Sequence, residues 1–486
     1  MVSVASSSDL GAELERVAGS LDSLDLTAAR LAGLNTDHKR ARALRTIRDY
    51  LIPRLKSPSA PLTVVLVGPT GSGKSTLLNS LAGTEISETG PLRPTTRRPV
   101  VLTSREARDG FSTIGGVSCR VVAGKAEVLN QIALVDTPDI DSVITEHRRT
   151  TETLIDHADV VVLVVSALRY ADEVPWEVLR RAVSRGASVL TVLNRVSRSS
   201  TGAIVDYRAR LAEAGLDAEL IRISEYRIPS SKSSLPPAAV KELARYLVSL
   251  AEDHQRRRDE TFQRAVESVA STVGEVISEA EQSASWIDEV VAGLRSELAE
   301  AASGVDLDSV VGSTELELEG ARKRFVPARQ RVLASRRRRL RGRLLALVEA
   351  DLRVTVLRSG ELVLAITGHE PKTVTTGLRP LVEETVDGWL HYVDRMVLNI
   401  PRKQRDMAAL VIAAAALGSS RQGLKEQGEE LVRRARRELE GRLQVLYGQV
   451  GEGLVELFTL AVAPPDVTEL TDRLEAMVAR SHFADA

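Results

Sequence analysis

The stretch that decides the fold is Gly68-Pro69-Thr70-Gly71-Ser72-Gly73-Lys74-Ser75-Thr76. It follows an apolar run at 63–67 and precedes a helical pattern at 77–82. A glycine-rich loop between a strand and a helix presents backbone N–H groups to phosphates, and the helix N-terminus adds partial positive charge. The stretch therefore predicts a nucleotide-binding P-loop at the end of the first strand of an α/β sheet.

The side chains of this loop have separate expected roles. Lys74 is expected to reach the β- and γ-phosphates, and the Ser75 hydroxyl is expected to ligate Mg²⁺. The residues expected to contact the nucleotide here are Gly68, Gly71, Ser72, Gly73, Lys74, Ser75 and Thr76. A chance glycine-rich turn is the alternative, and the flanking strand and helix argue against it. The loop alone does not indicate which nucleotide binds.

The choice between an ATPase and a GTPase depends on the next acidic strand end. An ATPase of the ABC-transporter type would carry an LSGGQ-like helix start and an apolar strand ending in Asp-Glu, and the sequence contains neither. Instead, the apolar run 132–135 ends in Asp136-Thr137-Pro138-Asp139, which resembles the third GTPase motif, DxxG, with Asp139 in the place of its glycine. Asp136 is therefore expected to hold Mg²⁺; the plainer interpretation is a capping residue after an ordinary strand. The backbone N–H of Asp139 would take over the γ-phosphate contact of the missing glycine.

A further stretch between these motifs, 93–102, reads Arg-Pro-Thr-Thr-Arg-Arg-Pro-Val-Val-Leu. It is similar to switch I of the dynamin superfamily, in which a threonine followed by Arg-Arg-Pro and an apolar strand covers the nucleotide. The resemblance implies that Thr96 ligates Mg²⁺ and orients the attacking water through its backbone carbonyl. Thr95 is the alternative, because the threonine doublet leaves the register open. The plainer interpretation of Arg97 and Arg98 is that they are solvated loop charges.

The expected base contact lies at Asn194-Arg195-Val196-Ser197, at the end of the apolar run 188–193. GTPases usually place Asn/Thr-Lys-x-Asp here, and the aspartate grips the guanine base. Asn194 is in the expected place and Arg195 would cover the base as a lysine does. Ser197, however, lacks the carboxylate that accepts two charge-assisted hydrogen bonds. Guanine selectivity is therefore expected to be weakened or supplied from elsewhere. Ser224, after the run 218–223, resembles the start of the fifth motif and carries little information.

The composition limits the classes of protein to be considered. At 486 residues the chain exceeds what one hydrophobic core usually serves. Lys and Arg number 65 against 66 Asp and Glu, so no global field commits the molecule to a charged partner. The single Cys119 excludes an intramolecular disulfide, and the seven histidines show no zinc-ligand spacing. The chain also lacks a signal-peptide pattern and a long apolar run. We expect a folded cytoplasmic protein.

The chain divides by pattern into three parts. Residues 1–61 are expected to form two helices that pack on a bundle and end in a Pro/Ser linker. Residues 62–250 alternate short apolar runs with helical segments, as in a parallel sheet with crossover helices. In the remaining part, 251–486, apolar residues step by three and four over 266–301 and again over 431–461, which predicts long packed helices. The expected fold is an α/β P-loop domain with a mostly parallel sheet, joined to an elongated all-α bundle or stalk.

Two features of the helical part would suit an anionic membrane. Residues 322–343 contain eleven basic residues and no acidic one, including Arg336 to Arg339, which surround most of a helix. The alternative is a solvated face, or pairing within the molecule against the acidic residues of 315–319. The second feature is an apolar run at 407–417 behind a basic collar, too short to span a bilayer as a helix. It would form either a membrane-contact tip near 400–418 or a buried helix of the bundle.

These motifs identify the chain as similar to bacterial dynamin-like GTPases. The resemblance implies Mg²⁺-dependent hydrolysis of GTP to GDP coupled to membrane association or remodelling, a homo- or hetero-oligomer formed through GTPase domains or stalk, and a peripheral place at the inner face of the cell membrane. The implied site uses Lys74, Thr96 and Asp136 for catalysis, Ser75, Thr96 and Asp136 for Mg²⁺, and Asn194 and Arg195 for the base. The alternative is a P-loop regulatory or scaffold protein that binds nucleotide with little turnover, favoured if the Asp139 and Ser197 departures mean degeneration. Aromatic residues at 3%, without a stacking cluster, argue against a nucleic-acid partner.

Overall fold

The computed structural model describes residues 4–88, 98–141, 145–197, 201–216, 218–227, 233–310, 326–367, 374, 377–419, 424 and 426–482. The chain forms two compact units. Unit 1 comprises Met1–Asp25, Asn35–Glu279 and Asp466–Ala486, and unit 2 comprises Leu26–Leu34 and Ala280–Pro465. The domain boundaries expected at residues 61 and 250 remain a prediction.

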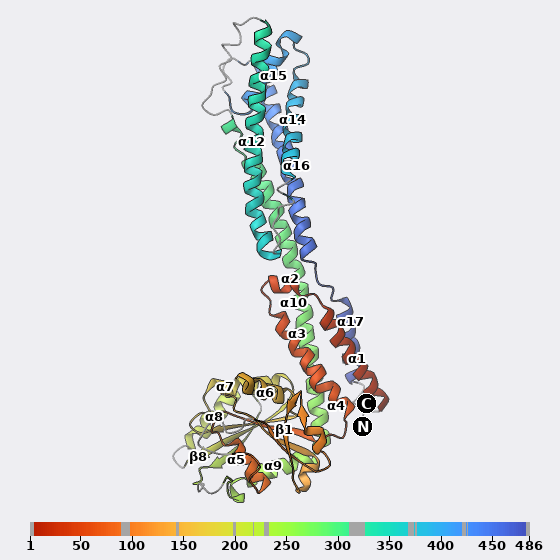
Figure 1. Cartoon of the computed structure of the whole chain (residues 1–486), viewed down its shortest axis with the longest axis vertical. Helices are drawn as coiled ribbons and strands as arrows, with labels where there is room; N and C mark the ends of the chain where they lie inside the picture. Colours follow the sequence, from red (N-terminus) through yellow and green to blue (C-terminus); the bar gives the residue numbers. More distant parts are fainter. Residues whose placement is uncertain are drawn as a thin grey trace. The chain divides into compact units, whose positions relative to one another are not determined.

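A seven-stranded sheet, counted over the described residues, forms the centre of unit 1 (Figure 1). In spatial order its strands are β5 (Arg120–Ala123), β2 (Val100–Thr103), β6 (Ile132–Asp136), β1 (Leu62–Val67), β7 (Val160–Ser166), β8 (Ser188–Val196) and β9 (Glu219–Ser224). Neighbouring strands are parallel, apart from the antiparallel pair β2 and β6. A separate hairpin pairs β3 (Thr113–Ile114) with β4 (Val117–Ser118). The predicted mostly parallel sheet is confirmed.

Helices cover both faces of the sheet. The core on one face joins the sheet to α6 (Thr145–Asp156), α7 (Glu173–Ser184) and α8 (Thr201–Glu213), and the core on the other face joins it to α5 (Lys74–Ala82) and α9 (Lys241–Glu252). Successive residues of β1 enter these two cores alternately, with Val65 in the first and Leu66 in the second. Strands buried on both faces are apolar throughout, which explains the unbroken runs in the sequence.

The register of the central strands determines where the site lies. Leu66 of β1 pairs with Asp136 of β6, and Val67 pairs with Leu163 of β7. Because β1, β6 and β7 run parallel, the loops that follow them leave the same edge of the sheet. The parallel register of β1 and β6 is therefore enough to place the P-loop next to Asp136.

The helices at the two chain ends also contribute to unit 1. They are α1 (Val4–Ser23), α3 (Thr36–Arg45), the π-helix η1 (Thr46–Leu51), α4 (Ile52–Lys56) and α17 (Thr468–His482), which packs against α1. The sequence predicts two helices before the Pro/Ser linker. The structure instead divides this segment into several shorter helices, one of which, α2 (Thr27–Leu31), belongs to unit 2. Gly33, with a φ of 77°, lies just after α2 and takes the left-handed conformation common at helix ends.

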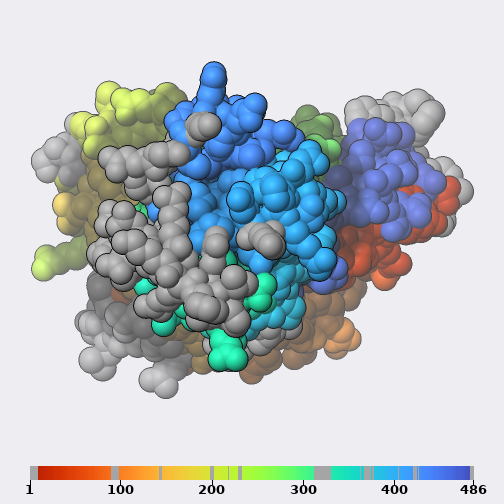
Figure 2. All heavy atoms as spheres, turned by 90° about the horizontal axis from the view of Figure 1, so that it is seen from above, coloured from red at the N-terminus to blue at the C-terminus, as the bar shows by residue number. Residues whose placement is uncertain are grey.

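Unit 2 is a helical bundle (Figure 1). Its main helices are the second part of α10 (His254–Gly304), α12 (Val326–Thr367), α14 (Leu378–Met396), α15 (Arg402–Ala416) and α16 (Glu426–Ala461). The predicted helical positions of 266–301 lie within α10, and those of 431–461 lie within α16. In Figure 2 the blue shades of α14, α15 and α16 lie side by side, in agreement with the packing of these helices on one another.

The apolar run 407–417 lies in the core of this bundle. Leu410 is 4% exposed, and Ile412, Ala416 and Leu417 are buried with it in the cluster that also holds Trp389. The indole of Trp389 donates a hydrogen bond to the backbone oxygen of Ala435, at 2.7 Å. Of the two expectations for this run, the structure shows the buried helix, and an exposed tip would require the bundle to open. No helix in the described part of the chain is both long and apolar enough to cross a bilayer.

The basic cluster on α12 pairs with α14. Arg337 binds Asp394, and Arg341 binds Asp387 through two hydrogen bonds of 2.5 and 2.6 Å. The sequence prediction of a partner in 315–319 concerns residues outside those that the structure describes. Arg338 and Arg339 are exposed, so the cluster divides into a paired face and a solvent face.

The chain's single cysteine, Cys119, is enclosed between β4 and β5. It is 4% exposed and belongs to the core that the sheet shares with α6, α7 and α8. Burial raises the pKa of the Cys119 thiol to about 11. The thiol is therefore a structural, apolar contact at neutral pH.

Candidate nucleotide site

The P-loop runs from the end of β1 to the start of α5 and requires glycine at two close approaches. A Cβ atom on Gly68 would lie 2.1 Å from the backbone oxygen of Val164 in β7. Gly73 has a φ of 105°, and a Cβ atom there would lie 2.4 Å from the amide nitrogen of Asn194. The loop backbone therefore lies close to β7 and to the end of β8, where the base contact is predicted.

Lys74 is buried beneath the loop and paired with Asp139. Its Nζ donates to Asp139 Oδ1 at 2.6 Å and to the backbone oxygen of Gly68 at 2.8 Å, and Lys74 is only 4% exposed. We predicted a backbone role for Asp139, in place of the glycine of the GTPase motif. The structure adds a role for the Asp139 carboxylate. It forms an ion pair with the Lys74 ammonium group, which a γ-phosphate would also need.

Ser75 and Asp136 meet as expected for Mg²⁺ ligands. The Ser75 hydroxyl donates to Asp136 Oδ2 at 2.6 Å, and the Ser87 hydroxyl donates to the same oxygen at 2.7 Å. Burial raises the pKa of Asp136, although the positive charge of Lys74 and the two hydroxyl donors act in the opposite direction. Hydroxyl and carboxylate oxygens are hard ligands, and Mg²⁺ commonly takes one carboxylate together with substrate phosphates. The donor set therefore fits Mg²⁺.

Ser87 is a site residue that the sequence did not reveal. Asn79 of α5 holds it in place: the Asn79 Oδ1 accepts from the backbone N–H groups of Ile86 and Ser87, and its Nδ2 donates to the Ser87 oxygen at 2.8 Å. The segment that leads into switch I is thereby anchored next to Asp136. Thr95, Thr96 and Arg97 lie outside the described residues, so the switch I assignments stay predictions. Arg98 is exposed and donates to the backbone oxygens of Ser118 and Cys119.

The tip of the P-loop is tied to the segment after β6 by a second carboxylate. Asp141 Oδ1 accepts from the backbone N–H and the hydroxyl of Thr70, at 2.7 and 2.6 Å. Its other oxygen accepts from Arg169 at 2.9 Å. Burial would raise the pKa of Asp141, but the hydrogen bonds from Thr70 and Arg169 outweigh it and hold the pKa below its ordinary value. This three-residue connection was also absent from the sequence prediction.

The predicted base-binding residues lie beside the P-loop. Asn194 is buried at the end of β8, where its Nδ2 donates to the backbone oxygen of Ser72 at 2.8 Å and its Oδ1 accepts from the Arg195 N–H. Arg195 is exposed and has a φ of 56°, a conformation that its Asn194 contact supports. Ser197 follows directly after β8. The geometry brings Asn194 and Arg195 to the loop, while guanine contact itself remains a prediction.

Comparisons with known proteins agree with this geometry. Residues 63–195 match the family described as 50S ribosome-binding GTPase. These residues form a GTPase domain. The match starts within β1 and ends at Arg195, and so includes the P-loop, Asp136 and Asn194. The sequence prediction of a GTPase, made from these same motifs, is confirmed at the level of the domain.

Individual relatives resemble the same part of the chain. A probable transmembrane GTPase FZO-like, chloroplastic, of Arabidopsis thaliana is 29% identical over 32% of this chain and 17% of its own length. The tRNA modification GTPase MnmE of Bordetella petrii is 36% identical over 28% of this chain and 26% of its own length. The chain thus spans about a quarter or less of these two relatives, and the resemblance is confined to the GTPase domain.

Among solved structures, the chain is similar to an oligomerised bacterial dynamin pair. That similarity covers 92% of this chain and 94% of the other, with 13% sequence identity and a TM-score of 0.43. The other protein is described as providing a mechanism for the long-range sensing and tethering of membranes. Independently of this similarity, the mostly parallel sheet of unit 1 and the helical bundle of unit 2 agree with the predicted α/β P-loop domain and all-α part.

Proposed function

We propose that this protein is a dynamin-like GTPase that hydrolyses GTP to GDP and uses the nucleotide cycle to control membrane association. The observation that carries the proposal is the convergence of Lys74, Ser75 and Asp136 at the carboxyl ends of β1 and β6. Lys74 and the loop N–H groups would bind the phosphates. Ser75 and Asp136 would hold Mg²⁺, which supplies charge neutralisation at the β- and γ-phosphates when bound.

The Lys74–Asp139 pair joins the lysine expected to bind the phosphates to the segment that follows β6. An incoming γ-phosphate is negatively charged and needs the same ammonium group, so the Asp139 carboxylate has to leave Lys74 when a triphosphate binds. Asp139 belongs to the segment that continues to Asp141 and to helix α6. Displacement of the Asp139 side chain would therefore move this segment. Through it, the binding of a triphosphate would change the conformation of the rest of unit 1.

The helical bundle is the proposed effector of this cycle. Helix α10 begins in unit 1 and continues as a main helix of unit 2, so the two units share one continuous element. We infer that the protein is cytoplasmic, binds peripherally to the inner face of an anionic membrane, and assembles through its GTPase domains or its bundle. The exposed Arg338 and Arg339 are the part of the basic cluster that would face anionic headgroups.

Phosphate release measured with GTP and with ATP tests the activity. Lys74→Ala should abolish nucleotide binding and turnover while circular dichroism stays unchanged, because the loop loses its cation over the phosphates. Ala or Ser at Asp139 should keep turnover, since that carboxylate is not a phosphate ligand. Turnover by Lys74→Ala at the wild-type rate would exclude the proposed site.

A second candidate function is nucleotide binding without turnover, as in a regulatory or scaffold protein. The buried Lys74–Asp139 pair favours it, because Asp139 stands where the third GTPase motif has glycine and its carboxylate holds the lysine that would stabilise the γ-phosphate during hydrolysis. Calorimetric titration with GTP and GDP separates the two candidates. Tight binding of both nucleotides, with no phosphate release in the presence or absence of anionic liposomes, would support the regulatory function.

A further inference from the structure

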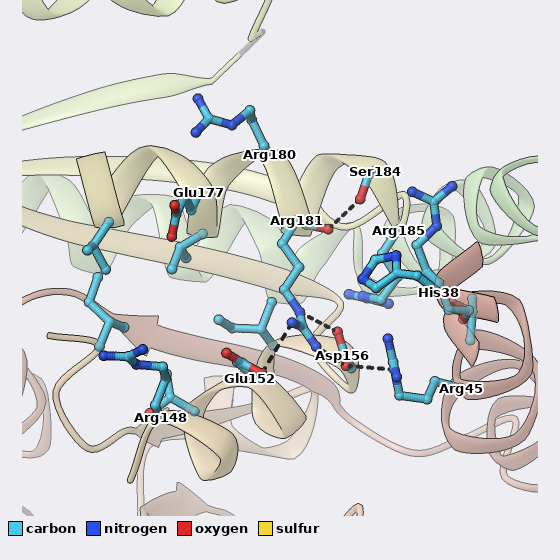
Figure 3. Close-up of a pocket in the computed structure, with 17 residues that line it drawn as sticks. His38, Arg45, Arg148, Glu152, Asp156, Glu177, Arg180, Arg181, Ser184 and Arg185 are labelled. Atoms are coloured by element: carbon cyan, nitrogen blue, oxygen red, sulfur yellow. Dashed lines mark hydrogen bonds and ion pairs between the residues drawn. The ribbon is translucent and has the colours of Figure 1, made fainter. Parts of the chain in front are cut away.

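A cavity of about 520 Å³ lies between the N-terminal helices of unit 1 and the GTPase domain (Figure 3). Its walls come from α3 and η1 on one side and from α6 and α7 on the other. It is separate from the P-loop, although Ile140 lines it and lies next to Asp139 of the nucleotide site. Cavities of this size commonly hold small organic ligands.

The cavity walls are rich in positive charge. Six arginines line it against three carboxylates. Two of the carboxylates are already occupied: Arg181 binds Asp156 through hydrogen bonds of 3.0 and 2.6 Å and lies 3.4 Å from Glu152, and Arg45 lies 3.8 Å from Asp156. Figure 3 shows these pairs as dashed lines between Arg181, Arg45 and the two acids. The pairs leave Arg42, Arg148 and Arg185 as further cations at the cavity.

Arg185 is the decisive residue because it is buried without enough acceptors. It is 4% exposed, and its Nη2 donates to the backbone oxygen of Ala158. Its Nε and Nη1 are buried and have no hydrogen-bond acceptor among the described residues. The guanidinium lies 4.6 Å from the centre of the Tyr50 ring, which stabilises a cation but accepts no conventional hydrogen bond. Burial lowers the pKa of Arg185, an effect that a bound anion would reverse.

The nearest buried carboxylate does not supply the missing acceptors. Asp159 accepts from the Tyr50 hydroxyl at 2.8 Å, from the Thr63 N–H at 2.6 Å and from Arg54. Arg42 repeats the pattern on the opposite wall: one end of its guanidinium donates to Thr272, while its buried Nε has no acceptor in the described part of the chain. Buried donors without acceptors are rare in folded proteins, and an ordered water or an ion is one common partner of such groups.

Part of the remaining wall of the cavity is apolar. Ile140, Ile155 and Val178 line it and are almost fully buried. A ligand that satisfies both walls therefore has an anionic group for the arginines and an apolar body for these side chains. We propose that this cavity binds a small organic anion, either a phosphate monoester or a carboxylic acid with an apolar body, and that Arg185 and Arg42 bind its charged group.

The test uses the full chain saturated with GDP and Mg²⁺, so that the P-loop is filled. The probes are phenyl phosphate and phenylacetate, titrated by calorimetry, with benzyl alcohol as the neutral comparison. Both anions should bind and benzyl alcohol should not. Arg185→Met should weaken phenyl phosphate binding about tenfold or more, because a charge-assisted pair of hydrogen bonds is lost. Arg208→Gln is the matched control, since Arg208 is exposed on α8 outside the cavity.

Arg42→Met provides a second variant if Arg185→Met does not fold, and it should weaken binding in the same direction. Three results would overturn the proposal. They are the absence of anion binding by the wild-type chain, equal affinities in wild type and in both folded methionine variants, and binding of benzyl alcohol as tight as that of phenyl phosphate. Because every variant carries the same P-loop, a failure of GTP hydrolysis would leave these comparisons valid.

Discussion

The side chain at position 139 is one of two departures of this nucleotide site from the GTPase pattern, the other being Ser197 in the base-binding motif. Glycine there would offer only an N–H group to the γ-phosphate, whereas Asp139 also places a carboxylate 2.6 Å from Lys74 Nζ. Both members of the pair are buried. The Asp139 carboxylate therefore competes with any anion that needs the Lys74 ammonium group.

Asp139→Asn should therefore raise the affinity for GTP by about tenfold, or about 1.4 kcal/mol, because the side chain keeps its size and loses its charge. Titration of a fluorescent GTP analogue measures the change. Asp109→Asn is the matched control, since it neutralises an exposed carboxylate that belongs neither to the P-loop nor to the residues that contact it. An unchanged or weaker affinity in Asp139→Asn would show that the carboxylate does not compete with the phosphate.

At the scale of elements, Asp141 connects the P-loop to the segment before α6 and to Arg169. Its pKa is lower in the folded chain than in the unfolded chain. Such a carboxylate stabilises the folded form above the unfolded pKa, about 3.9 for aspartate, and this stabilisation is lost as the pH falls through the lower folded value. Asp141→Asn should lower the melting temperature at pH 7, and its difference from wild type should shrink below about pH 4. The exposed Asp109→Asn is the control in a series of thermal melts, and a constant difference at all pH values would contradict the prediction.

The sequence predicted those parts of the site that depend on spacing along one strand and its following loop. Asp136 is the last residue of β6, and Lys74 begins α5 after the loop that follows β1, so the parallel register of β1 and β6 brings them together. Ser87 could not be predicted in this way, because it lies 49 residues from Asp136 in the sequence. Its position is fixed by hydrogen bonds from the backbone N–H groups of Ile86 and Ser87 to the Asn79 side chain. The arginine cavity depends on how α3 packs against α6 and α7, and no local pattern in the sequence records that contact.

In the bundle, the sequence likewise could not decide the environment of the apolar run 407–417. An apolar run behind basic residues suits a membrane tip and a buried helix equally well, and only its packing distinguishes them. Leu410→Ala should cost about 2 to 5 kcal/mol of unfolding free energy, as expected for a leucine in a packed core. Leu398→Ala is the matched control, because Leu398 is 54% exposed in the same unit. Calorimetric melts compare the two; equal effects would mean that α15 is not held in the core.

At the scale of the whole molecule, membrane binding is expected to depend on the solvent face of the basic cluster. Replacing Arg338 and Arg339 by Gln should weaken binding to anionic vesicles at low salt by about 1 kcal/mol per charge, and the difference should vanish at high salt. Arg433 and Arg437 provide the matched double substitution, since both pair with Glu430 on α16. Vesicle co-sedimentation across a salt series measures both. Equal loss in the two variants would indicate general charge attraction instead of a specific face.

The burial of Cys119 makes the intact chain convenient for fluorescence spectroscopy. Maleimide dyes react with thiolates, and a thiol with a pKa of about 11 is almost wholly protonated at neutral pH as well as shielded from the reagent. Cysteines introduced on the surface of each unit would therefore take donor and acceptor dyes while the native thiol stays in place. Energy transfer between such dyes would report, molecule by molecule, whether the distance between the two units changes when GTP is added.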